Sequence, residues 1–317
     1  MRCTKSQAIG LALSLLWLCA PGESRAFCLA YQCDPDNSAS VPCERDANGC
    51  SMEGAALRRR SNCVTVAVAQ GSTKNEIGID DNEFAAVITE AFSLWTNVDC
   101  GGGSPPGLKV QFAGAVAANG PFACEALPAQ NIDVWRVSNA FPNPSGVTQT
   151  TGAIAGRTKP IFTLPNGKIF DADVELNGLW LSLFLQDPVQ MRGILRTVAA
   201  HEAGHALGLA HSLDAKSLMF RAYEVMPMRI PTPDDVRGIC TLFPPASLQC
   251  APPVVPAAAL RQVDCDNEVS ASAGGCSVAS LDHTNRQSRH ADLGLLLVAA
   301  LAFAGYLRLG TQSSRHR

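Results

Sequence analysis

Apolar residues recur with the period of an α-helix between residues 81 and 97. They fall on a single helix face, at Phe84, Val87, Ile88, Ala91, Phe92 and Trp95. Asp80 and Glu83 provide a capping pair at the start of this predicted helix. The helix should end before the glycines at positions 101–103, because glycine disfavours a helical backbone.

A second helix is predicted for residues 188–207. Asp187 can serve as its N-cap, and Pro188 suits its first turn because proline fixes a helical φ. Thr232 and Pro233 open a third, shorter helix in the same way.

Other stretches are short, rich in branched residues and partly alternating, which predicts β-strands. The clearest is residues 63–70, where valines at every second position alternate with other residues. The remaining predicted strands are residues 108–112, 132–137, 152–163 and 168–177, the last two as a hairpin around residues 165–167. Trp95 and Trp135 are expected in the core.

The second predicted helix carries the motif HEAGHALGLAH. His201 and His205 are four residues apart, so a helix places both imidazoles on one face, one turn apart. Gly208 ends the helix and turns the chain back, which lets His211 supply a third nitrogen from the other side. Three neutral imidazoles leave one coordination position open, the arrangement of a catalytic zinc site.

Glu202 follows the first of these histidines, where a carboxylate can reach a metal-bound water without being a ligand. Zinc would lower the pKa of that water towards neutrality and polarise a scissile carbonyl. Glu202 would accept the water proton and later pass it to the leaving amine.

The complete pattern, HExxHxxGxxH followed eight residues later by Met219, resembles the metzincin zinc peptidases. Ser212 and Asp214 after the third histidine resemble the matrixins, the matrix metalloproteinase family. The stretch PTPDDVRGICTLF at residues 231–243 resembles the matrixin C-terminal helix. The resemblance covers about residues 64–243 of this chain.

This resemblance implies an α+β fold of the metzincin (zincin-like) type, with a twisted, mostly parallel sheet, an antiparallel edge strand, an active-site helix and a C-terminal helix. The edge strand, expected in residues 152–163, would pair with an extended substrate. Met219 would form an apolar floor beneath the imidazoles. Tyr223 matches a tyrosine that lines the substrate side-chain pocket of the family, whereas Arg221 stands where matrixins usually have proline.

The histidine count predicts one zinc ion. All three histidines of the catalytic region belong to the motif, whereas animal matrixins hold a second, structural zinc largely with histidines. Asp171, Asp173 and Glu175 alternate on one strand face. Two interpretations of these acids are open: a calcium site, as in acidic loops of this family, or a solvated strand face.

Export is predicted by the first 26 residues, which have a charged start, an apolar run and a small-residue cleavage site. Eleven of the 13 cysteines remain after this signal peptide, so disulfides and at least one unpaired thiol are expected. A second zinc site is the alternative, but CxxC pairs at ribbon spacing are lacking. The odd thiol is either Cys276 in a sorting tail or a thiol from residues 28–63 resting on the zinc as a latency switch.

The remaining organisation follows from composition. Residues 27–62 form a cysteine-rich segment, residues 63–244 the catalytic domain, and residues 245–290 a linker rich in Pro, Ala and Ser. Residues 291–317 contain an apolar helix and a basic tail, either a plain membrane anchor or the end of a sorting tail. The Arg58–Arg60 run is interpreted as a solvated charge run, with a processing site as the alternative.

The net charge of −3 and the lack of a basic stripe with interleaved aromatics argue against a nucleic-acid partner. The sequence therefore predicts an exported zinc metalloendopeptidase acting on protein or peptide substrates, secreted or held at the cell envelope through its C-terminal helix. The alternative is a non-catalytic, zinc-binding adhesive module of the same fold. Glu202 argues against that alternative, because a binding module has no use for a general base. Ser212 argues against other metzincin families.

Overall fold

The computed structural model describes residues 27–33, 43–117, 132–140, 154–163, 166–221 and 229–253, together with the backbone of residues 276–277. The predicted signal peptide (1–26) and C-terminal apolar helix (291–317) lie outside these residues. None of the helices within the described ranges has the length and apolarity needed to cross a membrane.

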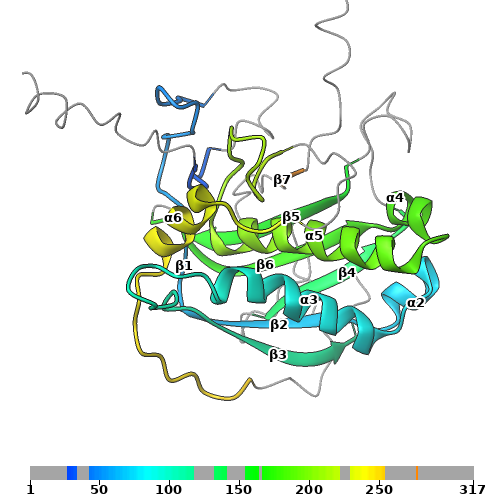
Figure 1. Cartoon of the computed structure of the whole chain (residues 1–317). Helices are drawn as coiled ribbons and strands as arrows, with labels where there is room; N and C mark the ends of the chain where they lie inside the picture. Colours follow the sequence, from blue (N-terminus) through cyan, green and yellow to red (C-terminus); the bar gives the residue numbers. More distant parts are fainter. Residues whose placement is uncertain are drawn as a thin grey trace, which may run out of the picture.

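The centre of the molecule is a sheet whose five main strands follow the spatial order β3 (Lys109–Val116), β2 (Cys63–Ala69), β4 (Ile132–Ser138), β6 (Lys168–Asn177) and β5 (Gly156–Thr163). The first four strands pair in parallel, and β5 is antiparallel to β6 (Figure 1). Two short strands extend it: β1 (Arg58–Arg59) pairs with β6, and β7 (Cys276–Ser277) pairs antiparallel with β5. The predicted α+β fold, with a mostly parallel sheet and an antiparallel strand, is confirmed.

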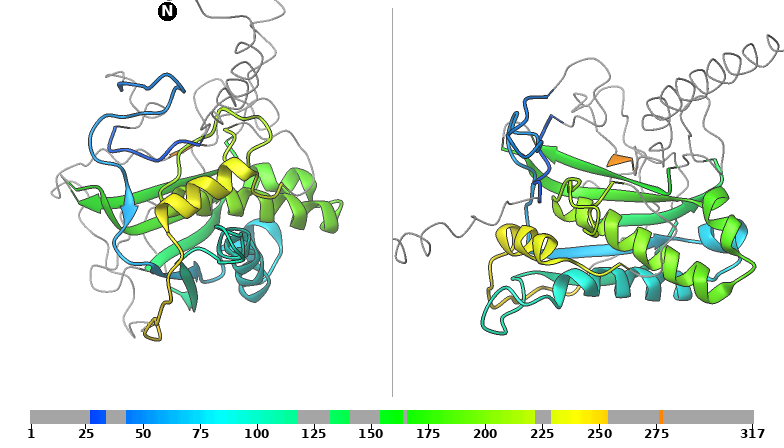
Figure 2. Two further views of the ribbon diagram at one scale, coloured as in Figure 1. Left: turned by 60° about the vertical axis from the view of Figure 1, so that its left-hand side comes forward. Right: turned by 45° about the horizontal axis from the view of Figure 1, so that its top comes forward.

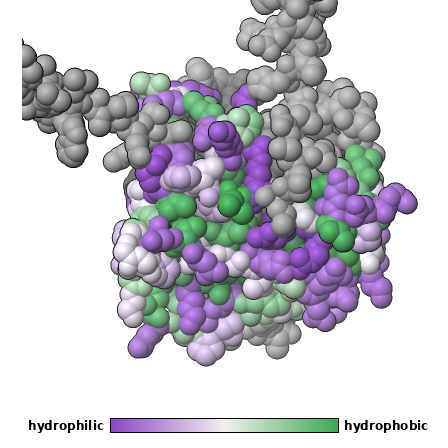
Figure 3. Space-filling model, in the orientation of Figure 1, coloured by the Kyte–Doolittle hydropathy of each residue, from purple (hydrophilic) through white to green (hydrophobic). Residues whose placement is uncertain are grey.

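Two long helices, α3 (Asp81–Thr96) and α5 (Pro188–Leu207), pack on one face of this sheet. Trp95 is completely buried between them, and its indole N–H donates to the Ala200 carbonyl at 2.7 Å. Trp135 of β4 is also completely buried, as predicted. Figure 3 shows polar and apolar side chains interspersed over the outer surface of this face, as is usual for a surface exposed to water.

The predicted helix ends are set by the expected caps. The Asp80 carboxylate accepts the backbone N–H groups of residues 82 and 83 at the start of α3, and Asp187 does the same at the start of α5. Gly208 ends α5 with φ 110°, in the left-handed region that favours glycine. Thr232 caps α6 (Pro233–Leu242) in a reciprocal capping box.

Three short elements did not follow from the sequence pattern: α2 (Ser72–Ile77), α4 (Gly178–Leu181) and the 3₁₀ turn Ser182–Phe184. Each is too short to display a helical period. The interpretation of Arg58–Arg60 as a solvated charge run is wrong for Arg59. Its side chain is buried as part of β1 and forms an ion pair with buried Asp133.

Four disulfides join cysteines within the described ranges: Cys28–Cys50, Cys33–Cys43, Cys63–Cys250 and Cys100–Cys240. The zinc-bound latency thiol proposed from residues 28–63 is therefore wrong, because all five cysteines of that stretch are paired. Cys33, Cys43 and Glu53 lie close enough to hold a metal, but the disulfide removes both thiolates from that role. Cys124 and Cys265 lie outside the described residues.

The N-terminal segment, which we define as residues 27–33 and 43–57, packs against the end of α5 and against α6 (Figure 2). The Ala30 N–H donates to the Gly208 carbonyl, and the Ala210 N–H donates to the Cys28 carbonyl, both at 2.9 Å. The turn that leads from α5 towards His211 is thus hydrogen-bonded to this segment.

Candidate active site

The three motif histidines meet at the end of α5. His201 and His205 project from adjacent turns of the helix, and the bend at Gly208 brings His211 back towards them. Nε2 of His205 lies 3.0 Å from Nε2 of His201 and 3.2 Å from Nε2 of His211. The predicted convergence of three imidazole nitrogens is present in the structure.

Backbone carbonyls orient the two helical imidazoles. Nδ1 of His201 lies 2.7 Å from the Leu218 carbonyl, and Nδ1 of His205 lies 2.8 Å from the Leu209 carbonyl. Because a carbonyl only accepts, each Nδ1 carries the proton and each Nε2 is left to bind a metal. Burial, followed by the neighbouring histidines, lowers the pKa of His201 well below its usual range, which favours the neutral, metal-binding form.

These nitrogens fit a zinc ion. With Zn–N bonds of about 2.0–2.1 Å, two ligands of a tetrahedral site lie about 3.3 Å apart, close to the 3.0 and 3.2 Å that separate Nε2 of His205 from Nε2 of His201 and of His211. His201 and His205 are buried, whereas His211 is half-buried, so the group is open on one side. Three nitrogen ligands with one open side suit a catalytic rather than a structural zinc.

Glu202 is completely buried between α5 and β5. The Thr158 hydroxyl donates to its Oε2 at 2.7 Å, and burial raises the pKa of the carboxyl to about 8, with the Thr158 bond opposing this shift. A Cβ atom at Gly156 would lie only 2.9 Å from Oε1, so glycine at this position makes room for the carboxylate. Glu202 is thereby fixed beside the histidines.

Met219 is buried against the active-site helix. A Cβ atom at Gly204, within the HEAGH motif, would collide with the Met219 sulfur and lie 3.0 Å from Trp95. Gly204 therefore allows the methionine turn to approach the helix between its two histidines. Sequence reasoning did not single out this glycine, although its place inside the motif was visible.

Asp235 of α6 supports the histidine group and was also missed. Its carboxylate accepts the Leu218 N–H at 2.9 Å and the Ser217 hydroxyl at 2.5 Å, and it accepts both the N–H and the hydroxyl of Thr232 at 2.8 Å. The carbonyl of Leu218 is the group that orients His201. Asp235 thus connects the start of α6 to His201 through a single residue, Leu218.

The predicted acidic face is not solvated. Asp171, Asp173 and Glu175 are buried, so the solvated-face interpretation is wrong. Glu175 forms an ion pair with Arg157. Within the described ranges, the groups with three candidate ligand atoms inside 4.8 Å do not include these acids. Calcium binding here stays a prediction.

Two of the buried carboxylates fill a split in the sheet. β4 and β6 pair only from Trp135 and Val174 onward. Before that point, the Val134 N–H donates to Asp173 and the Ala172 N–H donates to Asp133, both at 3.0 Å. The carboxylates replace ladder hydrogen bonds that the separated strands cannot make.

Asp171 beside this split gives a stability prediction. Burial, and then the carboxylates of Asp173 and Asp133, raise its pKa well above the usual range. The raised pKa in the folded state favours folding at low pH, and this contribution is lost as pH rises above the unfolded-state pKa and through the folded-state pKa. We therefore expect Asp171→Asn to stabilise the protein by roughly 1–3 kcal/mol at pH 7 and by less at pH 4.

Thermal unfolding at both pH values, in a chelator and then in calcium, checks this prediction. Glu44→Gln is the control, because Glu44 is exposed. Lower stability of Asp171→Asn at pH 7 would contradict it. A calcium-dependent rise in the melting temperature of the wild type, absent in Asp171→Asn, would instead establish calcium binding at this residue.

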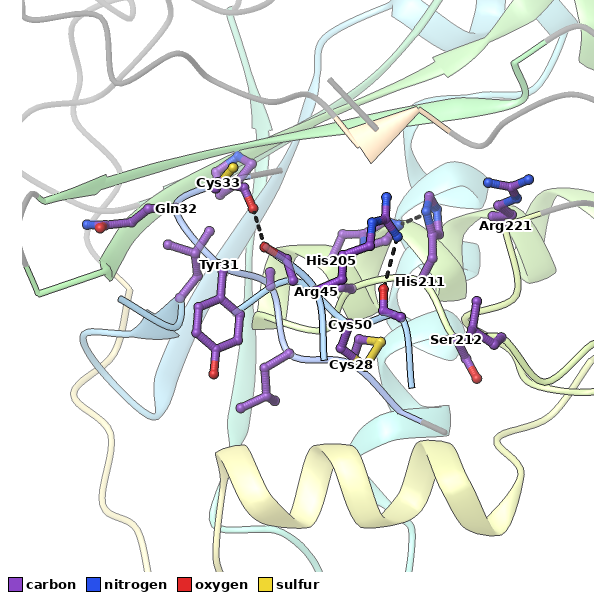
Figure 4. A pocket seen from close by; sticks show the side chains of 18 of the residues that line it. Cys28, Tyr31, Gln32, Cys33, Arg45, Cys50, His205, His211, Ser212 and Arg221 are labelled. Atoms are coloured by element: carbon purple, nitrogen blue, oxygen red, sulfur yellow. Dashed lines mark hydrogen bonds between the residues drawn. A yellow bond between two sulfur atoms is a disulfide. The ribbon is translucent and has the colours of Figure 1, made fainter. Parts of the chain in front are cut away.

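The two residues predicted for the substrate pocket have different outcomes. Arg221 is exposed and lines a pocket that His205 and His211 also line (Figure 4). The opposite wall of this pocket is the N-terminal segment, including Arg45. Tyr223 lies outside the described residues.

Comparison with known proteins agrees with this geometry. Residues 134–244 match the family model described as Matrixin. Human matrix metalloproteinase-20 is 48% identical over 64 residues, which are 20% of this chain and 13% of that protein. Human matrix metalloproteinase-19 is 52% identical over 54 residues (16% and 11%), and horse stromelysin-1 is 49% identical over 55 residues (16% and 12%). The matches thus cover little more than a tenth of each relative.

Proposed function

We propose that this chain, whose residues 134–244 are matrixin-like, is a zinc-dependent endopeptidase that hydrolyses extended protein or peptide substrates. The observation that carries the proposal is the convergence of three Nε2 atoms beside the buried Glu202 carboxylate, which Thr158 holds in place. Three ligands, an open side and an adjacent base are the parts that metal-assisted hydrolysis of an amide needs.

His201, His205 and His211 would hold the zinc. When bound, zinc supplies a Lewis acid that makes a water nucleophilic near neutral pH and polarises the scissile carbonyl. Its charge also favours the ionised form of nearby Glu202, opposing the effect of burial on the carboxyl pKa. Met219 is not a ligand in this proposal and forms the apolar surface against which the helix packs.

Glu202 performs the proton transfers. Its carboxylate accepts a proton from the attacking water and returns it to the nitrogen of the leaving amine, so that the base is regenerated. The Thr158 hydroxyl occupies Oε2, which fixes the carboxylate and presents Oε1 to the water. A fixed base loses little entropy in the transition state, which supports catalysis.

The edge of β5 is the proposed place for the substrate backbone. The register of β5 with β7, Arg157 with Ser277 and Thr158 with Cys276, shows that an antiparallel strand can pair with β5 next to Thr158. A substrate in the same direction would take the place of β7 and gain main-chain hydrogen bonds beside Glu202. This arrangement favours extended polypeptides over small amides.

Export is part of the proposal. Four disulfides in the described ranges fit an oxidising compartment, and residues 1–26 have the pattern of a signal peptide. Secretion and attachment at the cell envelope are distinguished by whether the mature protein retains residues 291–317.

Zinc content together with hydrolysis tests the proposed function. We expect one zinc per purified chain, cleavage of a denatured protein, loss of cleavage with a chelator and recovery on adding zinc. Elemental analysis and mass spectrometry of the products measure these outcomes. Bound zinc without hydrolysis of any peptide would refute the peptidase and favour the adhesive module, and two zincs per chain would refute the single-site assignment.

A further inference from the structure

We propose that the pocket between the N-terminal segment and the motif histidines is a substrate subsite for an acidic side chain that precedes the scissile bond. The inference rests on the proposed peptidase function, because it assigns a specificity to the same site. The pocket has a volume of about 100 Å³. At about 10–15 Å³ per water molecule, the pocket has room for roughly 7–10 water molecules. One side chain could replace them.

One wall of the pocket is a fixed part of the molecule. The Cys28–Cys50 disulfide closes it, and the Leu57 N–H donates to the Ala30 carbonyl at 2.7 Å. The hydrogen bonds of Ala30 and Cys28 to residues 208 and 210 then tie this wall to the turn before His211. The wall therefore keeps a constant position relative to the metal ligands.

The pocket carries positive charge. Arg45 from the N-terminal segment and Arg221 from beyond Met219 both line it, and none of the described lining residues is acidic. The nearby Asp46 carboxylate does not line the pocket. It accepts the backbone N–H groups of Asn48 and Cys50 at 2.9 Å instead. Charge complementarity thus favours a carboxylate ligand.

Arg45 is placed to receive such a ligand. Its Nη1 donates to the Gly49 carbonyl at 2.9 Å, which holds the side chain at the wall. A guanidinium has five N–H donors in a planar fork, so one bond to a carbonyl leaves capacity for a carboxylate. Pro160 and Phe162 of β5 supply an apolar surface for the methylene groups of the ligand. An aspartate or glutamate side chain matches both features.

Strand direction places the subsite before the scissile bond. Glu202 meets β5 near its start, at Gly156 and Thr158, whereas the pocket contains Pro160 and Phe162 further along β5. A substrate antiparallel to β5 runs from the Phe162 end towards the Gly156 end. The residues that pass the pocket are thus on the N-terminal side of the bond attacked beside Glu202. At about 3.4 Å per residue, they are within the last four residues before that bond.

Peptide hydrolysis with charge-reversal variants tests this subsite. Cleavage sites in a denatured protein are mapped first with the full-length protein. Peptides based on the best site then carry Glu, Gln or Lys at each of four positions on either side of the cleaved bond. We expect kcat/KM to be about tenfold higher for Glu than for Gln at one N-terminal position, and no such preference on the C-terminal side.

Arg45→Glu and Arg221→Glu should each reverse this preference towards Lys, a gain that a misfolded protein cannot show. Arg60→Glu is the matched control, because Arg60 is exposed and does not line the pocket; it should keep the preference for Glu. Cleavage without an acidic preference, or the same reversal in Arg60→Glu, would overturn the subsite alone. If the zinc-loaded wild type cleaves no peptide at all, the proposed function and the subsite fall together.

Discussion

Glu202→Gln should retain zinc and the fold but lose hydrolysis by about 10²–10⁴-fold in kcat, the usual contribution of a positioned general base. The amide is nearly the same size as the carboxylate, so the buried space between α5 and β5 stays filled. It can still meet the Thr158 hydroxyl, since an amide oxygen accepts a hydrogen bond as Oε2 does. It cannot accept a proton from water.

Zinc content, melting temperature and kcat of the variant measure this separation of binding from catalysis. Thr158→Val is a graded comparison, because it removes only the hydrogen bond that fixes the carboxylate and should lower kcat by a smaller factor. Full activity of Glu202→Gln would show that another group removes the proton. Loss of zinc from the variant would show that Glu202 belongs to the ligand set, contrary to the geometry.

Asp235→Ala should weaken zinc binding by about 10–100-fold, the usual effect of removing an outer-shell partner. Without the carboxylate, the Leu218 N–H and the Ser217 hydroxyl lose their acceptor. The Leu218 carbonyl can then move away from Nδ1 of His201, which loses its fixed orientation. Zinc affinity, measured by competition with a chelator while the protein is folded, reports this effect.

Asp80→Ala is the matched control. Asp80 also accepts two backbone N–H groups at the start of a helix, so its loss costs helix stability of about 1 kcal/mol. It lies at the start of α3, which carries none of the metal ligands. Equal zinc affinities in the two variants would mean that Asp235 only stabilises the fold and does not position His201.

Local sequence patterns were sufficient for the long elements and for the convergence of His201, His205 and His211. The periodicity of α3 and the caps at Asp80, Asp187 and Gly208 act within one helix, and the spacing of His201 and His205 depends only on helical geometry. These features need no knowledge of the rest of the chain.

Features that depend on contacts between distant segments did not follow from the sequence. Asp235 acts on Leu218 across 17 positions, and Asp133 meets Arg59 across 74. The split between β4 and β6 places the Asp173 carboxylate against the backbone of β4. The alternation of acidic residues along β6 had suggested metal binding or exposure to solvent. Such partners are set by strand order, which local patterns do not contain.

Because disulfides hold parts of the cleft together, its assembly depends on the redox state of the compartment in which the chain folds. The three histidines lie within 11 positions of one another, but the surroundings that complete the site are joined by bonds that form only where thiols are oxidised. Cys100–Cys240 attaches α6, the helix of Asp235, across 140 positions, and Cys28–Cys50 closes the wall beside His211. A chain that still has reduced cysteines therefore possesses the ligands before it possesses the finished cleft.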